Sequence, residues 1–226
     1  MSSNTHPQQV GPTTESLRHF ARVALWSLPV WSLLLFLSTL THQPDPATEF
    51  EAYARYITTD RFLVSHLFAS IVGAGFGMIG FIALFISLVS GRVGRLPLVA
   101  LVAAVFGNSL VTSVFGVAAF AQPAIGEAYL AGDTAQAVAF DKDVYSAPLF
   151  ATAGVGLVLF AAGITAFGIA VQRAHRYPPF AGIVFAIGGL LFAIVGFLFV
   201  DILQPVGAIL MALSTAAMAL GRKGNQ

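Results

Sequence analysis

The sequence contains no cysteine and few charged residues. Its 226 residues include 11 Lys and Arg and 10 Asp and Glu, which together make up 9% of the chain. Without cysteine there is no disulfide, no thiolate nucleophile and no cysteine-ligated zinc or iron–sulfur cluster. Charged residues are also missing from the centre of every long apolar stretch. Proton pumps, voltage sensors and many ion-coupled transporters place charges there, so this absence argues against such mechanisms.

Apolar residues, by contrast, are abundant. They make up 57% of the chain, and the mean hydropathy is +0.84. A soluble core of this size cannot hide so many apolar side chains, so lipid is the expected solvent. Several stretches are long enough to cross about 30 Å of hydrocarbon as helices. The sequence therefore predicts an all-α polytopic membrane protein with six transmembrane helices, at 23–41, 62–90, 96–121, 145–171, 180–200 and 203–220.

The positive charges predict the orientation of these helices. One side of the membrane would carry eight cations: Arg18, Arg22, Arg92, Arg95, Arg173, Arg176, Arg222 and Lys223. The other side would carry three, namely Arg55, Arg61 and Lys142. Because cytoplasmic loops are enriched in Lys and Arg, we expect a multi-pass protein of the cell membrane with both termini in the cytoplasm. The basic residues lie in short turns beside the membrane, which gives no reason to expect nucleic-acid binding.

The segments outside the spans differ in character. Residues 1–17 are rich in Ser, Thr, Pro and Gln, which predicts a disordered cytoplasmic tail ahead of a single membrane domain at 18–224. Two long outer loops follow, at 42–61 and 122–144. Both contain helix-forming runs, so neither is expected to be a simple turn.

In the first outer loop, four apolar side chains recur at helical spacing. Phe50, Tyr53, Ala54 and Ile57 share one face, with charged residues on the others. We expect a short amphipathic helix lying at the outer membrane interface. Tyrosines of the two loops are candidate interface anchors, namely Tyr53, Tyr56, Tyr129 and Tyr145.

A recurring Gln-Pro dipeptide indicates an internal repeat. Gln43-Pro44, Gln122-Pro123 and Gln204-Pro205 follow the three outward-going helices and are spaced 79 and 82 residues apart. The turns Arg92–Pro97 and Arg173–Pro178 also resemble each other. We interpret the chain as three parallel copies of a helical hairpin, related by an axis along the membrane normal. Chance similarity among apolar segments of low complexity is the alternative.

Small residues punctuate the apolar stretches. Gly75, Gly77 and Gly80 match a dinucleotide-binding fingerprint, but that motif requires a preceding strand and a water-exposed helix start. Close helix packing explains the glycines better, and the expected contact positions are Gly73, Gly77, Gly154, Gly156, Gly163 and Gly188.

Candidate ligand-binding residues are the polar side chains within the spans or at their outer ends. They are Asn108, Gln43, Gln122, Gln204, Tyr53 and Tyr129. Asn108 is the most polar point at mid-depth, and it either contacts a substrate or makes an interhelical hydrogen bond. The glutamines either satisfy backbone groups freed by proline or line a shared outer vestibule.

A second hypothesis for the outer side is a metal site. Its candidate ligands are His66, His42, Asp143 and Asp201. Imidazole and carboxylate groups bind zinc, copper or iron, although no metal-ligand spacing occurs on a single helix. The alternative is that these histidines simply hydrogen bond at the interface. No cofactor is identified by the sequence.

Three functions remain open at this stage. The first is a non-catalytic binding, sensing or accessory subunit, whose partners would be the bilayer and an apolar small molecule or a partner membrane protein. The second is a channel or transporter for an uncharged solute, lined by Asn108, Thr112, Thr152 and Ser214. The third is an outer-face enzyme that uses His66.

The charge distribution makes a topological prediction. Protease or tag mapping is expected to place Arg92 and Asp133 on opposite sides of the membrane, because one lies in a basic turn and the other in an acidic loop. Finding both on the same side would contradict the orientation.

Overall fold

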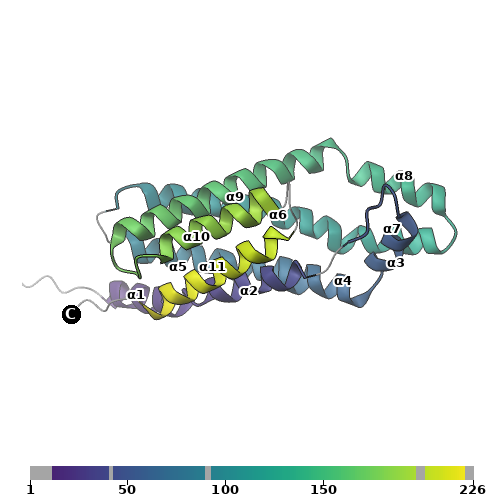
Figure 1. The fold of residues 1–226 in the computed structure, drawn as a ribbon. Coiled ribbons are helices and arrows are strands. Elements are labelled where there is room, and N and C mark those ends of the chain that lie inside the picture. The colour runs from purple at the N-terminus through teal and green to yellow at the C-terminus, as the bar shows by residue number, and fades with distance from the viewer. Residues whose placement is uncertain (1–11, 41–42, 90–92, 197–201, 222–226) are drawn as a thin grey trace, which may run out of the picture.

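The chain folds into an elongated helical bundle. In the computed structural model, the described residues are 12–40, 43–89, 93–196 and 202–221, and they form helices with no strand among them (Figure 1). In chain order the elements are α1 (Pro12–Ala24), α2 (Ser27–Ser38), α3 (Phe50–Ile57), α4 (Asp60–Val64), the π-helical segment η1 (Ser65–Val72), α5 (Gly73–Val89), α6 (Leu96–Phe120), α7 (Gln122–Leu130), α8 (Thr134–Val144), α9 (Ala147–Ala174), α10 (Ala181–Leu190), the π-helical segment η2 (Leu191–Gly196) and α11 (Leu203–Leu220).

Five helices are long and apolar enough to cross a membrane. They cover Glu15–Ser38, Asp60–Val89, Leu96–Leu130, Ala147–Ala174 and Leu203–Leu220. The predicted span at 180–200 is described as a shorter apolar helix, Ala181–Gly196, and residues 197–201 lie outside the described residues. Large apolar side chains point outward on several helices, and Phe106, Val158 and Leu213 are more than 60% exposed. Such a surface fits a lipid environment.

One predicted boundary is wrong. The first helix already begins at Pro12, so residues 12–17 are helical instead of part of a disordered tail; Glu15 lies in its first turn, where a negative charge is favourable. At the predicted end of the third span, α6 ends at Phe120 and α7 begins at Gln122, and the two form one long helical run, Leu96–Leu130. The amide of Ala121 bonds the carbonyl of Val117, and the amide of Ile125 bonds the carbonyl of Ala121, so hydrogen bonds connect the two helices on both sides of the Gln-Pro pair.

The three Gln-Pro pairs lie in three different local structures. Gln43-Pro44 is outside any helix, Gln122-Pro123 is inside a long helical rod, and Gln204-Pro205 is in the first turn of α11. The dipeptides therefore do not mark a common corner. Each span packs against the next one along the chain, and α11 packs against α2, which closes the bundle into a ring. The relation of three hairpins by symmetry stays a prediction.

Glycines allow α6 and α9 to lie in direct backbone contact. A β-carbon on Gly107 would overlap the backbone of Phe160, and one on Gly163 would overlap the backbone of Ala104. This agrees with small-residue packing in membrane helices. Gly154 is different, because its added β-carbon would meet nothing within 4 Å. The expected packing role is therefore right for Gly163 and wrong for Gly154.

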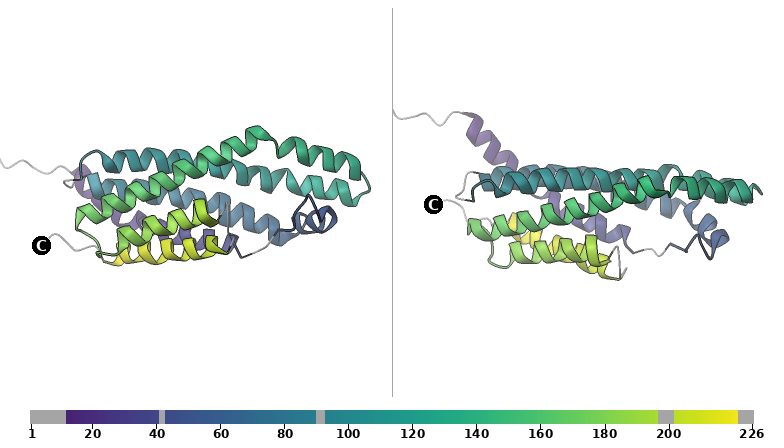
Figure 2. Two further views of the ribbon diagram at one scale, coloured as in Figure 1. Left: turned by 45° about the horizontal axis from the view of Figure 1, so that its top comes forward. Right: turned by 90° about the horizontal axis from the view of Figure 1, so that it is seen from above.

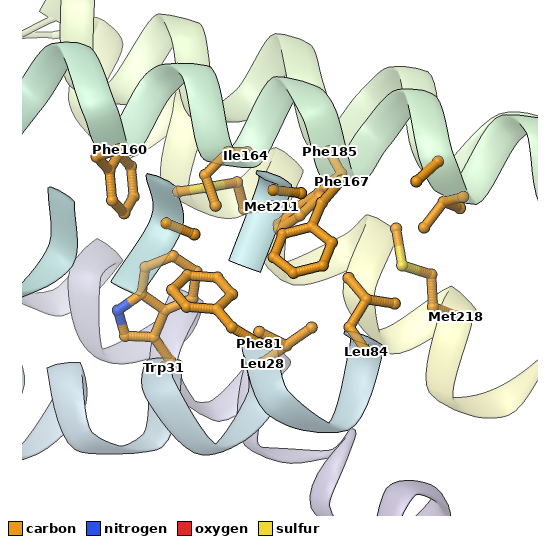
Figure 3. Close-up of a cluster of buried hydrophobic side chains, with 14 of the residues drawn as sticks. Leu28, Trp31, Phe81, Leu84, Phe160, Ile164, Phe167, Phe185, Met211 and Met218 are labelled. Atoms are coloured by element: carbon orange, nitrogen blue, oxygen red, sulfur yellow. The ribbon is translucent and has the colours of Figure 1, made fainter. Parts of the chain in front are cut away.

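Aromatic side chains fill the interior of the bundle. The ring of Trp31 on α2 lies edge-on to Phe81 on α5 and to Phe160 on α9, with centroid distances of 5.1 and 5.7 Å. Phe81 in turn stacks on Phe167 at 5.9 Å. Figure 3 shows these rings in one continuous cluster with Phe185. The row joins four helices along the bundle interior.

The two ends of the molecule differ in charge. The α9–α10 turn with Arg173 and Arg176 lies at the same end as α1, which carries Arg18 and Arg22 (Figure 1). At the opposite end, α3, α7 and α8 form what we call the cap, and Figure 2 shows the α6–α7 and α8–α9 rods running into it. The cap carries acidic side chains on all three of its helices: Glu51, Glu127, Asp141 and Asp143. The structure thus separates the charges as expected; which side faces the cytoplasm stays a prediction.

The close approach of α6 and α9 generates a matched pair of substitutions. Gly107→Ala is expected to lower the free energy of unfolding by about 1–3 kcal/mol, because the added methyl group must push the two backbones apart. Gly154→Ala is expected to be neutral or stabilising by up to about 1 kcal/mol, since the site is open and alanine favours the helix. Thermal or denaturant unfolding in detergent measures both. Equal effects of the two substitutions would contradict this packing.

Candidate functional site

The cap is built by packing α3 onto α7. Tyr53, Ala54 and Ile57 are fully buried, so the predicted helix and its apolar face are confirmed. Gly126 on α7 makes the contact close, since a β-carbon there would lie 2.8 Å from the carbonyl oxygen of Ala54. The face meets protein, so the prediction that Tyr53 is an interface anchor is wrong.

A chain of hydrogen bonds links three helices beneath α3. The Nε2 amide of Gln122 donates to the hydroxyl of Tyr53 at 2.9 Å, and that hydroxyl donates to Oδ1 of Asp141 at 3.0 Å. All three side chains are buried, with exposed fractions of 3%, 0% and 7% respectively. The chain ties α3, α7 and α8 together, so it holds the cap in one arrangement.

Burial dominates the electrostatics of this cluster. Burial raises the pKa of Asp141, and the hydrogen bond from Tyr53 lowers it in part. Burial also raises the pKa of Tyr53 and of Tyr145, and the nearby charge of Asp141 adds to both effects. The hydrogen bond of the Gln122 amide lowers the pKa of both tyrosines and so partly opposes the effect of burial. Both tyrosines therefore stay neutral hydroxyls at ordinary pH.

A cavity of about 180 Å³ lies beneath this cluster. Among the described residues, four polar side chains contribute to its wall, and the others are apolar. The lining residues are Gln43, His66, Val111, Val114, Phe115, Ala118, Gln122, Tyr145, Ala153 and Leu157. An engineered apolar cavity of about 150 Å³ is known to hold benzene, so this one has room for a single-ring molecule. It is a mostly apolar space with a few polar groups, as ligand sites usually are.

His66 is held in the cavity wall by its neighbours. Its Nδ1 lies 2.9 Å from the carbonyl oxygen of Phe62, and its ring packs on the ring of Phe62 at a centroid distance of 4.1 Å. A carbonyl oxygen can only accept, so Nδ1 carries the proton and Nε2 is an acceptor. His66 also lies in the π-helical segment η1, and π-helical turns occur frequently at functional sites.

A second, smaller space continues toward the bundle centre. It measures about 10 Å³ and shares Val111, Phe115 and Leu157 with the larger cavity. Asn108 and Trp31 also line it. The side-chain amide of Asn108 donates to the carbonyl of Ala74 at 3.1 Å, which is the interhelical hydrogen bond that was one of its two expected roles. The Nε1 of Trp31 is buried with no hydrogen-bond partner, and the space is about the size of one water.

The structure brings some predicted site residues together and separates others. Gln43, His66 and Gln122 line one cavity, and Tyr53 bonds Gln122. Tyr129 instead packs on Phe50 inside the cap at a centroid distance of 4.8 Å. Gln204 packs against Gly196 at the start of α11 and is not among the residues that line the cavity. Ligand binding by these side chains stays a prediction.

The two candidate metal ligands that the structure describes do not line the same cavity. Asp143 lines a groove between α7 and α8, whereas His66 lines the cavity beneath the cap. His42 and Asp201 lie outside the described residues. In the part of the chain that the structure describes, no three His, Asp or Glu side chains are grouped for a metal ion.

Sequence reasoning missed two residues of this site. Asp141 was assigned only to an acidic loop, yet it accepts the hydrogen bond of Tyr53, a residue 88 positions away. Phe115 was not singled out, although it lines both cavities. A local signal exists for neither, because both roles arise from helix packing.

Comparisons with known proteins give no guide to the role of this site. No family model matches the chain, and neither a curated protein nor a solved structure shows significant similarity to it.

The buried carboxyl predicts a pH-dependent stability difference. A carboxyl whose pKa is raised by folding stabilises the fold below its unfolded pKa of about 3.9, and this contribution is lost as the pH rises through the folded pKa. Asp141→Asn keeps an oxygen acceptor for Tyr53 and cannot ionise. The Tm of this variant relative to the wild type is therefore expected to increase from pH 4 to pH 7.

The control is Asp143→Asn, which removes an exposed carboxylate from the same helix. Its effect on Tm measures the general consequence of losing one negative charge and is subtracted. If the remaining Tm difference for Asp141→Asn is the same at both pH values, the carboxyl is not perturbed by burial in the cap.

Proposed function

We propose that this chain is a multi-pass membrane protein that binds a small, mostly apolar molecule in the cavity beneath the cap, as a binding, sensing or accessory subunit. The observation that carries the proposal is the cavity itself. Its floor is formed by Val111, Phe115 and Leu157, and polar side chains stand on its cap side. Such a wall suits a molecule with an apolar body and one polar end.

The depth of the cavity supports this ligand class. The helix Leu96–Leu130 has 35 residues and is about 52 Å long, against about 30 Å of hydrocarbon. Counted from Leu96 beside the basic turn, Val111 lies about 22 Å and Gln122 about 39 Å along the rod. The cavity would straddle the boundary between hydrocarbon and water, where molecules of mixed polarity concentrate.

The packing of the bundle interior favours binding over conduction. A pathway along the axis would have to pass the ring of Trp31 and the rings of Phe81 and Phe160, which both contact it (Figure 3). Two side chains of the expected pathway are also occupied with their own helix, since Thr152 donates to Pro148 and Ser214 to Met211. Transport of an uncharged solute stays a weaker alternative. An enzyme using His66 has less support, since none of the described residues that line the cavity is acidic.

Native mass spectrometry of the purified chain tests the proposal with a matched pair of variants. Ala153 lines the cavity, whereas Ala151 on the same helix is exposed. A retained small molecule is expected on the wild type and on Ala151→Phe, and its occupancy is expected to fall at least tenfold on Ala153→Phe because the phenyl ring fills the space. Identical occupancy on all three proteins, or none on any, would rule the proposal out.

A further inference from the structure

The amide of Gln122 is fixed in one orientation. Its Nε2 donates to the hydroxyl of Tyr53, whose own proton is committed to Asp141. While Asp141 is ionised, turning the amide over would place two acceptors against each other or withdraw the Tyr53 proton from the Asp141 carboxylate. Both outcomes leave a buried polar group unsatisfied, which is costly. The hydrogen bonds of the cap therefore decide which end of the Gln122 amide has no partner in the cap.

The end of the amide without a partner is its oxygen, which is a hydrogen-bond acceptor. Oε1 of Gln122 is buried and has no hydrogen-bond partner among the described residues, and the side chain lines the cavity. The hydroxyl of Tyr145 also belongs to the cavity wall but makes no hydrogen bond to this oxygen. Buried acceptors in proteins are nearly always satisfied, so an unsatisfied one in a cavity wall calls for a ligand that donates.

His66 presents the same kind of group. Its Nδ1–H is used by the carbonyl of Phe62, which leaves Nε2 as an acceptor in the wall of the same cavity. Two acceptors from different helices thus contribute to one mostly apolar space. A ligand that only accepts hydrogen bonds, such as a ketone or an ether, would gain nothing from either group.

We propose that the cavity selects compact apolar molecules that carry a hydrogen-bond donor, a hydroxyl or an N–H, which donates to Oε1 of Gln122. The inference rests on the proposed function, because it names the class of molecule that the same cavity takes. The volume of about 180 Å³ limits the buried part to about one substituted ring. Phe115 and Leu157 would contact the two faces or edges of that ring, as apolar walls do in ligand sites.

The test compares two probes that differ only in the donor. p-Cresol and p-xylene have the same ring and one methyl group in common, and the second substituent is a hydroxyl in one and a methyl in the other. Binding of each to the detergent-solubilised wild type is measured by equilibrium dialysis. Ala153→Phe in the same detergent corrects for partitioning into micelles. After this correction, p-cresol is expected to bind at least tenfold more tightly than p-xylene, since only p-cresol satisfies the buried acceptor.

Two variants locate the preference. Gln122→Met replaces the amide by an apolar chain of similar length, and the ratio of the two affinities is expected to fall toward one. Gln43→Met changes another glutamine of the cavity wall and is expected to keep the wild-type ratio. Loss of the preference in Gln43→Met but not in Gln122→Met would overturn the assignment to Gln122.

Comparison of the wild type with Ala153→Phe distinguishes failure of the donor preference from failure of the binding function. If both probes bind with equal affinity and Ala153→Phe blocks both, the donor preference is wrong while the binding function stands. If neither probe binds the wild type above the Ala153→Phe protein, the cavity does not take molecules of this size, and both proposals are overturned.

Discussion

The backbones of α6 and α9 approach so closely at Gly107 and Gly163 that no β-carbon fits between them. This contact joins two rods that run from the basic end of the molecule into the cap (Figure 2). Gln122 and Phe115 lie on one rod, and Ala153 and Leu157 lie on the other. All four residues line the cavity. The distance between the two rods therefore sets the width of the cavity.

The cap orients the Gln122 side chain on one of these two rods. Tyr53 comes from α3, and it can reach Gln122 and Asp141 only because α3 lies directly on Gly126 of α7. The resulting chain of hydrogen bonds is buried, so each member must be satisfied by another. One acceptor of the chain, Oε1 of Gln122, has no hydrogen-bond partner among the described residues, and its side chain lines the cavity. A structural network thus supplies the polar group of a candidate binding site.

Helix packing explains which sequence interpretations fail. The apolar face of Phe50, Tyr53, Ala54 and Ile57 was correctly predicted, but this face packs on α7 instead of on the membrane interface. Similarly, Gln122-Pro123 resembles the other Gln-Pro pairs, yet here the helix continues because both flanking hydrogen bonds are made. Hydrophobic periodicity indicates that one face of a helix is apolar, and a proline indicates that one backbone N–H donor is missing. Neither pattern indicates which part of the molecule packs against that face or that residue.

The sequence by itself determined the class of molecule: apolar stretches, their helical periodicity, and charges gathered at opposite ends of those stretches. These properties are local, because each depends on neighbouring residues along one segment. Only the tertiary structure decided the site. Tyr53 and Asp141 are 88 residues apart, and Gln43, His66 and Gln122 meet at one cavity because separate segments of the chain pack side by side. Contacts of that kind depend on the shapes of several helices together, which no single stretch of sequence encodes.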